Sequence, residues 1–242
     1  MGGTLEDIFV DAASEKKAIE RLDEILKSHG IDLGVDHAAL KASVDAGLLR
    51  YGAYRDRTSI ERKPDEIWCD YVMTNFNIPR EKLAPISTEI AHMWEVTHYN
   101  RSLRPRVAEM LQGLQDLGLK LGVISNTAAL YQVFDVLEAY GIRDYFRDVT
   151  LSSLTGFRKP SGDIFTVSLR QLQSKPEECV YVGDTVSRDV IGSKRAGFAG
   201  AIQISSHLTK EKDAGITHEF EPDYLVENIY DVLPIVTKLV KG

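Results

Sequence analysis

The chain has 242 residues, of which 43% are hydrophobic and 27% are charged, a composition typical of a folded globular protein. Its formal net charge of −7 argues against nucleic acid as the main partner, because phosphate backbones favour basic surfaces. Cys69 and Cys179 are the only cysteines and lack a metal-ligand spacing. The start of the chain is acidic, and no apolar stretch is long enough to cross a membrane. These features and the cysteine usage predict a cytoplasmic protein that does not bind membranes.

The first part of the chain, from about Ser14 to Asn100, has a helical hydrophobic pattern and no convincing strand. Four helices are expected there from the positions of capping residues, proline and glycine. They are a helix with Ser14 as N-cap and Gly30 as stop, a second from Asp36 through Leu49, a third beginning at Pro64, and a fourth over about 86–99.

From Pro105 onward, short apolar strands alternate with amphipathic helices. The expected strands are Leu119–Ile124, Val149–Leu151, Cys179–Val182 and Ala201–Ile204. The expected helices cover about 105–118, 130–140, 164–172 and the residues from Asp189 to near Gly197. This alternation predicts an α/β fold with a Rossmann-like, doubly wound parallel sheet covered on both faces by helices.

Together the two patterns predict a discontinuous core. Residues 1–12 and 100–242 are expected to form the α/β domain, and residues 13–99 an inserted all-helical domain. The connections between the two are expected near Phe9–Ala13 and Tyr99–Leu103.

Two carboxylates come after the expected strand Cys179–Val182 and the glycine that follows it, Gly183. Asp184 comes directly after it, and Asp189 lies five residues later, at the start of the next helix. Ligands bind at the carboxyl ends of the strands in an open parallel sheet. Two carboxylates beside a glycine turn suit Mg²⁺, which takes one or two carboxylates, waters and substrate phosphate. A helix cap at Asp189 and a solvated turn at Asp184 would also explain the pattern.

Polar groups suited to phosphate follow two other elements. Ser125, Asn126 and Thr127 end one strand, where a hydroxyl and backbone N–H groups can cradle a phosphate. Lys159 or Arg158, in the loop before Pro160, can neutralise a transferring phosphoryl group. Simple helix capping and solvated surface charges are the alternative explanations.

The order of these motifs, with their flanking sequences Leu121–Asn126, Val180–Thr185 and Asp189–Gly197, resembles the haloacid dehalogenase superfamily over essentially the whole chain. The helical insert resembles that superfamily's C1-type cap domain. The resemblance implies an aspartate nucleophile at the end of the first strand, which attacks phosphorus and forms an aspartyl-phosphate that water hydrolyses.

The resemblance also implies roles for named residues. Ser125 and Lys159 would be catalytic and hold the phosphoryl oxygens. Mg²⁺ would be bound by Asp184, with Asp189 in support and the backbone carbonyl of Gly2 as a further ligand. The expected substrate-binding residues are Thr4, Asn126, Thr127 and Arg158.

The start of the chain departs from the superfamily's first motif. Aligning Gly3-Thr4-Leu5 with the Gly-Thr-Leu end of that motif places Met1 one position after the nucleophile. The nucleophilic aspartate is therefore expected just before Met1, and the 242-residue chain alone is expected to be inactive. Gly2 replaces the second aspartate and cannot shuttle a proton. A less favoured alternative makes Asp7–Val10 the strand and Asp11 the nucleophile.

The expected reaction is Mg²⁺-dependent hydrolysis of a small phosphomonoester by a monomer or homodimer. One alternative is a catalytically inactive binding or regulatory protein. Another is a phosphonatase-like enzyme, which would need a Schiff-base lysine from the cap, with Lys16, Lys17, Lys41 and Lys63 as candidates. The cap segment Arg50–Arg57, rich in arginine and tyrosine, is either a leaving-group site or a solvated helix end. His92 and His98 are expected to be surface or packing residues of the cap.

Overall fold

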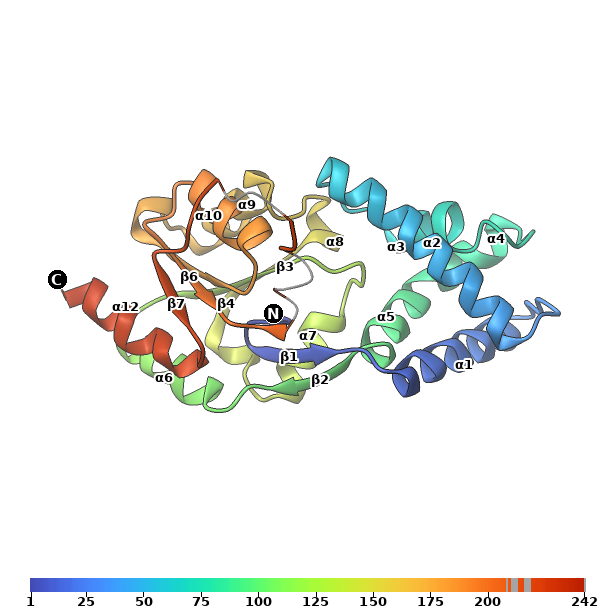
Figure 1. Cartoon of the computed structure of the whole chain (residues 1–242), viewed down its shortest axis with the longest axis horizontal. Helices are drawn as coiled ribbons and strands as arrows, with labels where there is room; N and C mark the ends of the chain where they lie inside the picture. Colours follow the sequence, from blue (N-terminus) through green and yellow to red (C-terminus); the bar gives the residue numbers. More distant parts are fainter. Residues whose placement is uncertain (208, 210–212, 216–218, 242) are drawn as a thin grey trace.

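The computed structural model describes residues 1–207, 209, 213–215 and 219–241. The α/β core lies at one end of an elongated molecule and the helical insert at the other (Figure 1). The chain crosses between them through an antiparallel ribbon of β1 (Glu6–Phe9) and β2 (Asn100–Leu103), in which Glu6 pairs with Leu103 and Phe9 with Asn100. The sequence did not predict β2.

The helical insert, called the cap below, contains the expected helices with changed boundaries. They are α1 (Ala12–Ser28), α2 (His37–Thr58), α3 (Pro64–Ile67), a π-helical segment (Trp68–Val72), α4 (Arg80–Leu83) and α5 (Ser87–Thr97). The prediction that Ser14 is the N-cap was wrong. Asp11 caps α1 by accepting a hydrogen bond from the Ser14 N–H at 2.8 Å, and Ser14 completes a capping box as the third helical residue.

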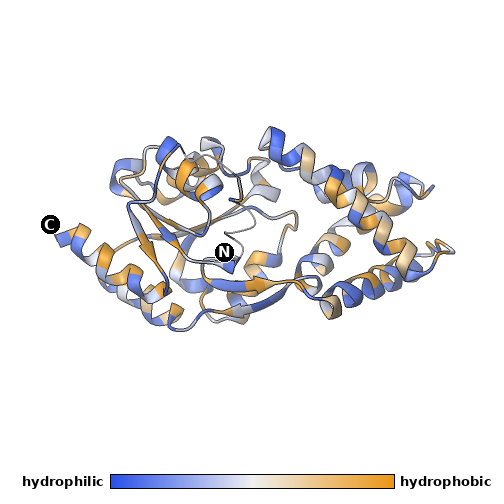
Figure 2. Ribbon diagram, in the orientation of Figure 1, coloured by the Kyte–Doolittle hydropathy of each residue, from blue (hydrophilic) through white to orange (hydrophobic). Residues whose placement is uncertain are grey.

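The second cap helix is longer than predicted. Asp36 caps it as expected, accepting from the Ala39 N–H at 2.8 Å, but the helix continues past Leu49 to Thr58. It ends where Ser59 adopts a left-handed conformation with φ of 53°. The cap buries its own hydrophobic cluster, in which Trp68 and Trp94 meet edge to face at 5.8 Å, while hydrophilic residues alternate with hydrophobic ones along its helices (Figure 2).

The core contains two groups of parallel strands. The first pairs β3 (Leu121–Ser125) with β4 (Phe146–Leu151), and the second has the order β5 (Val180–Gly183), β6 (Gly200–Ile204) and β7 (Tyr224–Val226). The accompanying helices are α6 (Val107–Asp116), α7 (Gln132–Ala139), α8 (Ser152–Thr155), α9 (Gly162–Leu172), α10 (Ile191–Arg195) and α12 (Val232–Lys241). Helix α9 packs on β3 and β4, and α12 on α6 (Figure 1). No helix in the described part of the chain is long and apolar enough to cross a membrane.

These elements confirm the predicted α/β class, but the parallel strands do not form one continuous sheet. Within the described ranges, β3 pairs only with β4, and β5 pairs only with β6. A cavity of about 700 Å³ adjoins both strands, and its lining includes Met1, Leu121–Ile124 of β3 and Val180–Val182 of β5.

Candidate functional site

The centre of the site is a buried ion pair between two predicted residues that are far apart in sequence. The Lys159 ammonium lies 2.6 Å from Asp189 Oδ1, and both side chains are almost fully buried. The same ammonium donates to the Ile124 carbonyl at 3.2 Å and to the Tyr181 hydroxyl at 3.0 Å. Lys159 therefore lies where β3 ends, next to Ser125, and is joined through Asp189 to the region that follows β5.

The environment keeps both members of this pair charged. Burial alone would raise the pKa of Asp189, but the Lys159 ammonium outweighs burial and holds that pKa well below its usual range. Burial alone would lower the pKa of Lys159, and the Asp189 carboxylate raises it above its ordinary value. Lys159 therefore stays a cation at the end of β3, paired with Asp189, and a cation at this position is what phosphoryl binding requires.

Asp184 lies beside the start of the chain. Its residue is 4% exposed, and the glycine turn at Gly3, with φ of 82°, passes directly against its carboxylate. A Cβ at Gly3 would overlap the Asp184 carboxylate, and a Cβ at Gly183 would overlap the side chain of Asp189. Glycine at both positions is therefore a consequence of how closely the backbone approaches the two carboxylates.

The residues after β3 form hydrogen bonds with the loop that carries Lys159 and with Ser152 of α8. Asn126 Oδ1 accepts a hydrogen bond from the Lys159 N–H at 2.9 Å, and Asn126 Nδ2 donates to the Lys159 carbonyl at 3.1 Å. The Thr127 N–H donates to Ser152 Oγ at 2.9 Å, and its hydroxyl accepts from the Ala129 N–H at 3.2 Å. Their side chains thus fix the loop, and the substrate contacts expected of them remain predictions.

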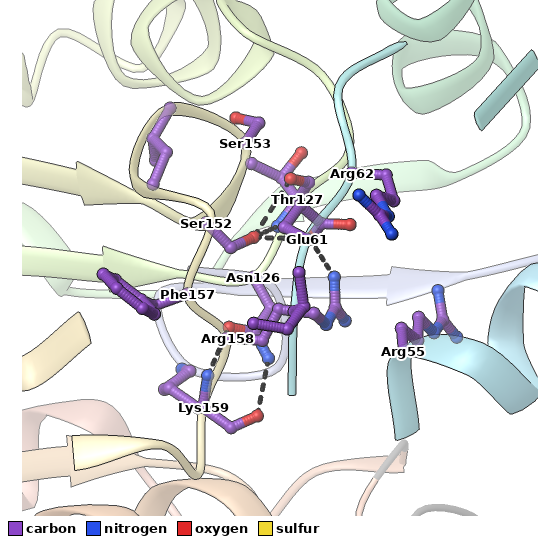
Figure 3. Close-up of polar contacts among 12 residues, drawn as sticks. Arg55, Glu61, Arg62, Asn126, Thr127, Ser152, Ser153, Phe157, Arg158 and Lys159 are labelled. Carbon is purple, nitrogen blue, oxygen red and sulfur yellow. Dashed lines mark hydrogen bonds and ion pairs between the residues drawn. The ribbon is translucent and has the colours of Figure 1, made fainter. Parts of the chain in front are cut away.

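Arg158 contacts the cap. Its guanidinium pairs with the buried carboxylate of Glu61, which follows α2, whereas the neighbouring Lys159 turns to the core (Figure 3). In this arrangement the partner of Arg158 is a protein carboxylate, and its expected role in substrate binding remains a prediction.

The predicted residues at the start of the chain form a tight turn. The Thr4 N–H donates to the Met1 carbonyl at 3.1 Å, and Gly2 forms a bridge with Glu6. Arg104, which the sequence analysis did not single out, donates to the Gly3 carbonyl and to the Ser205 carbonyl, each at 3.0 Å. Arg104 therefore fastens this turn to the segment after β6.

The donor set fits a magnesium ion. Asp184 supplies a buried carboxylate beside the Gly3 turn, whose own carbonyl is taken by Arg104, and the Gly2 carbonyl expected from the sequence remains a predicted ligand. Asp189 is already engaged, because its Oδ2 accepts from the Thr185 N–H at 3.0 Å and the Thr185 hydroxyl at 2.7 Å. Among the residues described, no group of three or more His, Cys, Asp or Glu side chains could hold a metal. Such a sparse set is what Mg²⁺ accepts when water and phosphate complete its shell.

Besides Arg104, two further contributors to this site were missed from sequence. Tyr181 lies inside a strand and looked like a packing residue, and Glu61 lies in a charged stretch without periodicity. A charged residue that is fully buried is a functional signal, but burial becomes visible only in the folded chain.

Comparison with known proteins identifies the family. A model described as haloacid dehalogenase-like hydrolase matches residues 68–197, more than half of the chain. The chain belongs to the haloacid dehalogenase-like hydrolase family. The resemblance to this family predicted from the motifs is confirmed. The matched range includes Ser125, Lys159, Asp184 and Asp189, whose individual roles remain predictions.

The chain is similar to proteins of known activity over part of its length. It is 33% identical over 138 residues to glyceraldehyde 3-phosphate phosphatase from Methanopyrus kandleri, covering 57% of this chain and 58% of that protein. It is 29% identical over 147 residues to ribulose-1,5-bisphosphate 5-phosphatase from Halopiger xanaduensis, covering 60% and 61%. The chain thus spans somewhat more than half the length of these relatives.

The fold agrees with solved structures over nearly the whole chain. The crystal structure of 2-haloacid dehalogenase from Pseudomonas syringae pv. Tomato DC3000 matches with a TM-score of 0.66 at 19% identity, covering 96% of this chain and 95% of that one. At this identity the likeness establishes the α/β fold.

Proposed function

We propose that the protein is a magnesium-dependent phosphohydrolase that acts on a small phosphomonoester. The observation that carries the proposal is the buried Lys159–Asp189 pair, which fixes a cation at the end of β3. Membership of the hydrolase family and similarity to two phosphatases of small phosphorylated sugars support the same reaction.

The residues would divide the work as follows. Lys159 and Ser125 would hold the phosphoryl oxygens, and Asn126 would keep the Lys159 backbone in place. Asp184 and the Gly2 carbonyl would hold Mg²⁺, which neutralises phosphate charge when bound. Asp189 would hold the Lys159 ammonium in place and would support the metal through a water molecule.

The nucleophile would be an aspartate just before Met1, on a strand placed between β3 and β5. Two observations support this position. Met1 is buried, and its carbonyl accepts a hydrogen bond from the turn whose Gly3 lies against Asp184. The apolar cavity beside it adjoins both β3 and β5. The carboxylate would attack phosphorus as the ester oxygen leaves, and water would then hydrolyse the aspartyl-phosphate. Because Gly2 carries no acid, the leaving oxygen would take its proton from another donor.

The test compares the 242-residue chain with a form extended by an apolar strand that ends in Asp before Met1. We expect Mg²⁺-dependent phosphate release from a panel of small phosphomonoesters by the extended form only, at least 100-fold above the 242-residue chain. Asp184→Asn should abolish it, and Asp→Asn at the added position is the matched control. Inorganic phosphate binding without hydrolysis in either form would contradict the proposal and indicate a binding protein.

A further inference from the structure

A short cap segment after α2 pairs with a core loop through a single antiparallel β-bridge. The left-handed turn at Ser59 redirects the chain, and the Glu61 N–H donates to the Gly156 carbonyl at 2.8 Å. The Arg158 N–H donates back to the Ser59 carbonyl at 2.9 Å, with Ile60 and Phe157 as the antiparallel pair between them. The cap is thus bonded by backbone to the loop that carries Lys159.

The Glu61 carboxylate is completely buried at this junction. One of its oxygens accepts from the Tyr51 hydroxyl, which belongs to the cap. The other pairs with the Arg158 guanidinium and accepts from the Ser152 hydroxyl at 2.6 Å, both of which belong to the core (Figure 3). A buried carboxylate is tolerated because these groups replace its hydration.

Both core partners of Glu61 belong to, or contact, the segments that would bind phosphate. Arg158 directly precedes Lys159, so its position constrains that of the lysine. Ser152 accepts a hydrogen bond from the Thr127 N–H at 2.9 Å, which fixes the loop after β3. The two segments are also joined to each other, because Asn126 bonds to both backbone polar groups of Lys159. We call Lys159 and the loop after β3 the phosphate-binding corner. The single carboxylate of Glu61 therefore binds partners on both sides of this corner.

We propose that Glu61 is a positioning residue that makes the geometry of the phosphate-binding corner depend on the docked cap. With the cap docked, Glu61 holds Arg158 and Ser152, and through them Lys159 and the loop after β3. With the cap displaced, Arg158 and Ser152 lose this acceptor and the corner loosens. This proposal rests on the proposed function, which assigns phosphate binding to Lys159 and Ser125.

The first test measures hydrogen exchange, which does not depend on activity. In Glu61→Gln, the amides of residues 59–61 and 156–159 and of Thr127 should exchange at least 10-fold faster than in the wild type. Amides of β6 should be unchanged. The control is Glu66→Gln, which removes a half-exposed carboxylate paired with Arg62 in the same cap, and it should leave these amides protected. Unchanged exchange in 156–159 would overturn the proposal.

The second test measures affinity for inorganic phosphate in the presence of Mg²⁺ by calorimetry. Glu61→Gln should raise the phosphate Kd about 10-fold, Glu61→Asp should fall between it and the wild type, and Glu66→Gln should match the wild type. Tyr51→Phe is a milder variant should Glu61→Gln fold poorly, and it should raise both exchange and Kd in the same direction. A phosphate Kd unchanged in Glu61→Gln despite faster exchange would reduce Glu61 to a purely structural contact and overturn the proposal.

These readouts separate the two proposals. If the extended form hydrolyses no ester but Glu61→Gln still weakens phosphate binding, the proposed function fails and the positioning role stands. If the extended form is active, Glu61→Gln should lower kcat/KM by roughly 10- to 100-fold. Wild-type kcat/KM in that variant would contradict the positioning role alone.

Discussion

Two consecutive residues, Arg158 and Lys159, each form a buried ion pair, but with different parts of the molecule. Lys159 pairs with Asp189 inside the core, where Tyr181 and Thr185 complete the network. Arg158 pairs with Glu61 of the cap, where Tyr51 and Ser152 complete it. The first pair needs only the core to fold, whereas the second needs the cap to be seated. One loop thus has one charge contact within the core and one with the cap.

The largest effect is expected from breaking the core pair. Lys159→Met leaves the Asp189 carboxylate buried without its cation, so the free energy of unfolding should fall by about 3–5 kcal/mol. Urea unfolding followed by circular dichroism measures this change. Lys17→Met, at an exposed lysine of α1, is the control and should change stability by less than about 0.5 kcal/mol. A loss below about 1 kcal/mol in Lys159→Met would mean that water or a counter-ion reaches Asp189.

Breaking the cap pair should cost less and act locally. In Arg158→Met the cap can undock and carry Glu61 into water, so we expect a loss of about 1–3 kcal/mol. Both tryptophans, Trp68 and Trp94, lie in the cap, so fluorescence reports on the cap and circular dichroism on the whole chain. The two urea transitions should separate in this variant. Coincident transitions with a loss equal to that of Lys159→Met would show that the two pairs are equivalent.

A fall in pH should destabilise the cap but not the core ion pair, without any substitution in either ion pair. Burial lowers the pKa of His98, which stacks on Trp94 at 4.7 Å. The unfolded chain therefore binds the proton more readily, and the stability from neutral His98 is present above about pH 6.5 and lost as pH falls below it. The free energy of unfolding measured by tryptophan fluorescence should fall between pH 7.5 and 5 in the wild type. It should fall less in His98→Gln. The core pair should not respond, because its pKa shifts keep both groups charged there.

The smallest effect is expected at Asp11. Its carboxylate caps α1, and asparagine caps helices about as well, so Asp11→Asn should leave the urea midpoint of unfolding essentially unchanged. Phosphate release by the extended form should be unchanged. Abolished turnover in a normally folded Asp11→Asn variant would instead revive Asp11 as the nucleophile.

The elements that the sequence predicted well are those with strong local signals. Strands β3, β5 and β6 are apolar runs bounded by polar residues, and each was located within about two residues. By contrast, β1 and β2 are four-residue segments, Glu6–Phe9 and Asn100–Leu103, with charged residues and little apolar alternation. They become strands because they pair across the insert, which is a non-local contact. Strand β7 and helix α12 were also not predicted.

The sequence by itself determined which positions are candidates for the site. Ser125, Lys159, Asp184 and Asp189 follow strands or lie in the loops between elements of an α/β pattern, and parallel strands bring their carboxyl ends to one edge. That inference needs only local periodicity and the rules of parallel sheets. The resemblance of the motifs to the haloacid dehalogenase superfamily, which goes beyond periodicity, identified the family and the chemistry that we propose.

Only the tertiary structure decided which carboxylate each cation contacts. Arg158 and Glu61 are 97 residues apart, and Lys159 and Asp189 are 30 apart. No local pattern distinguishes Glu61 from the exposed acidic residues around it, and the motif that contains Asp189 does not say which cation it contacts. The distinction comes from burial, since a desolvated carboxylate must find a cation and hydrogen-bond donors where the packed chain places them. The division of one loop between a core pair and a cap pair is therefore a property of the fold.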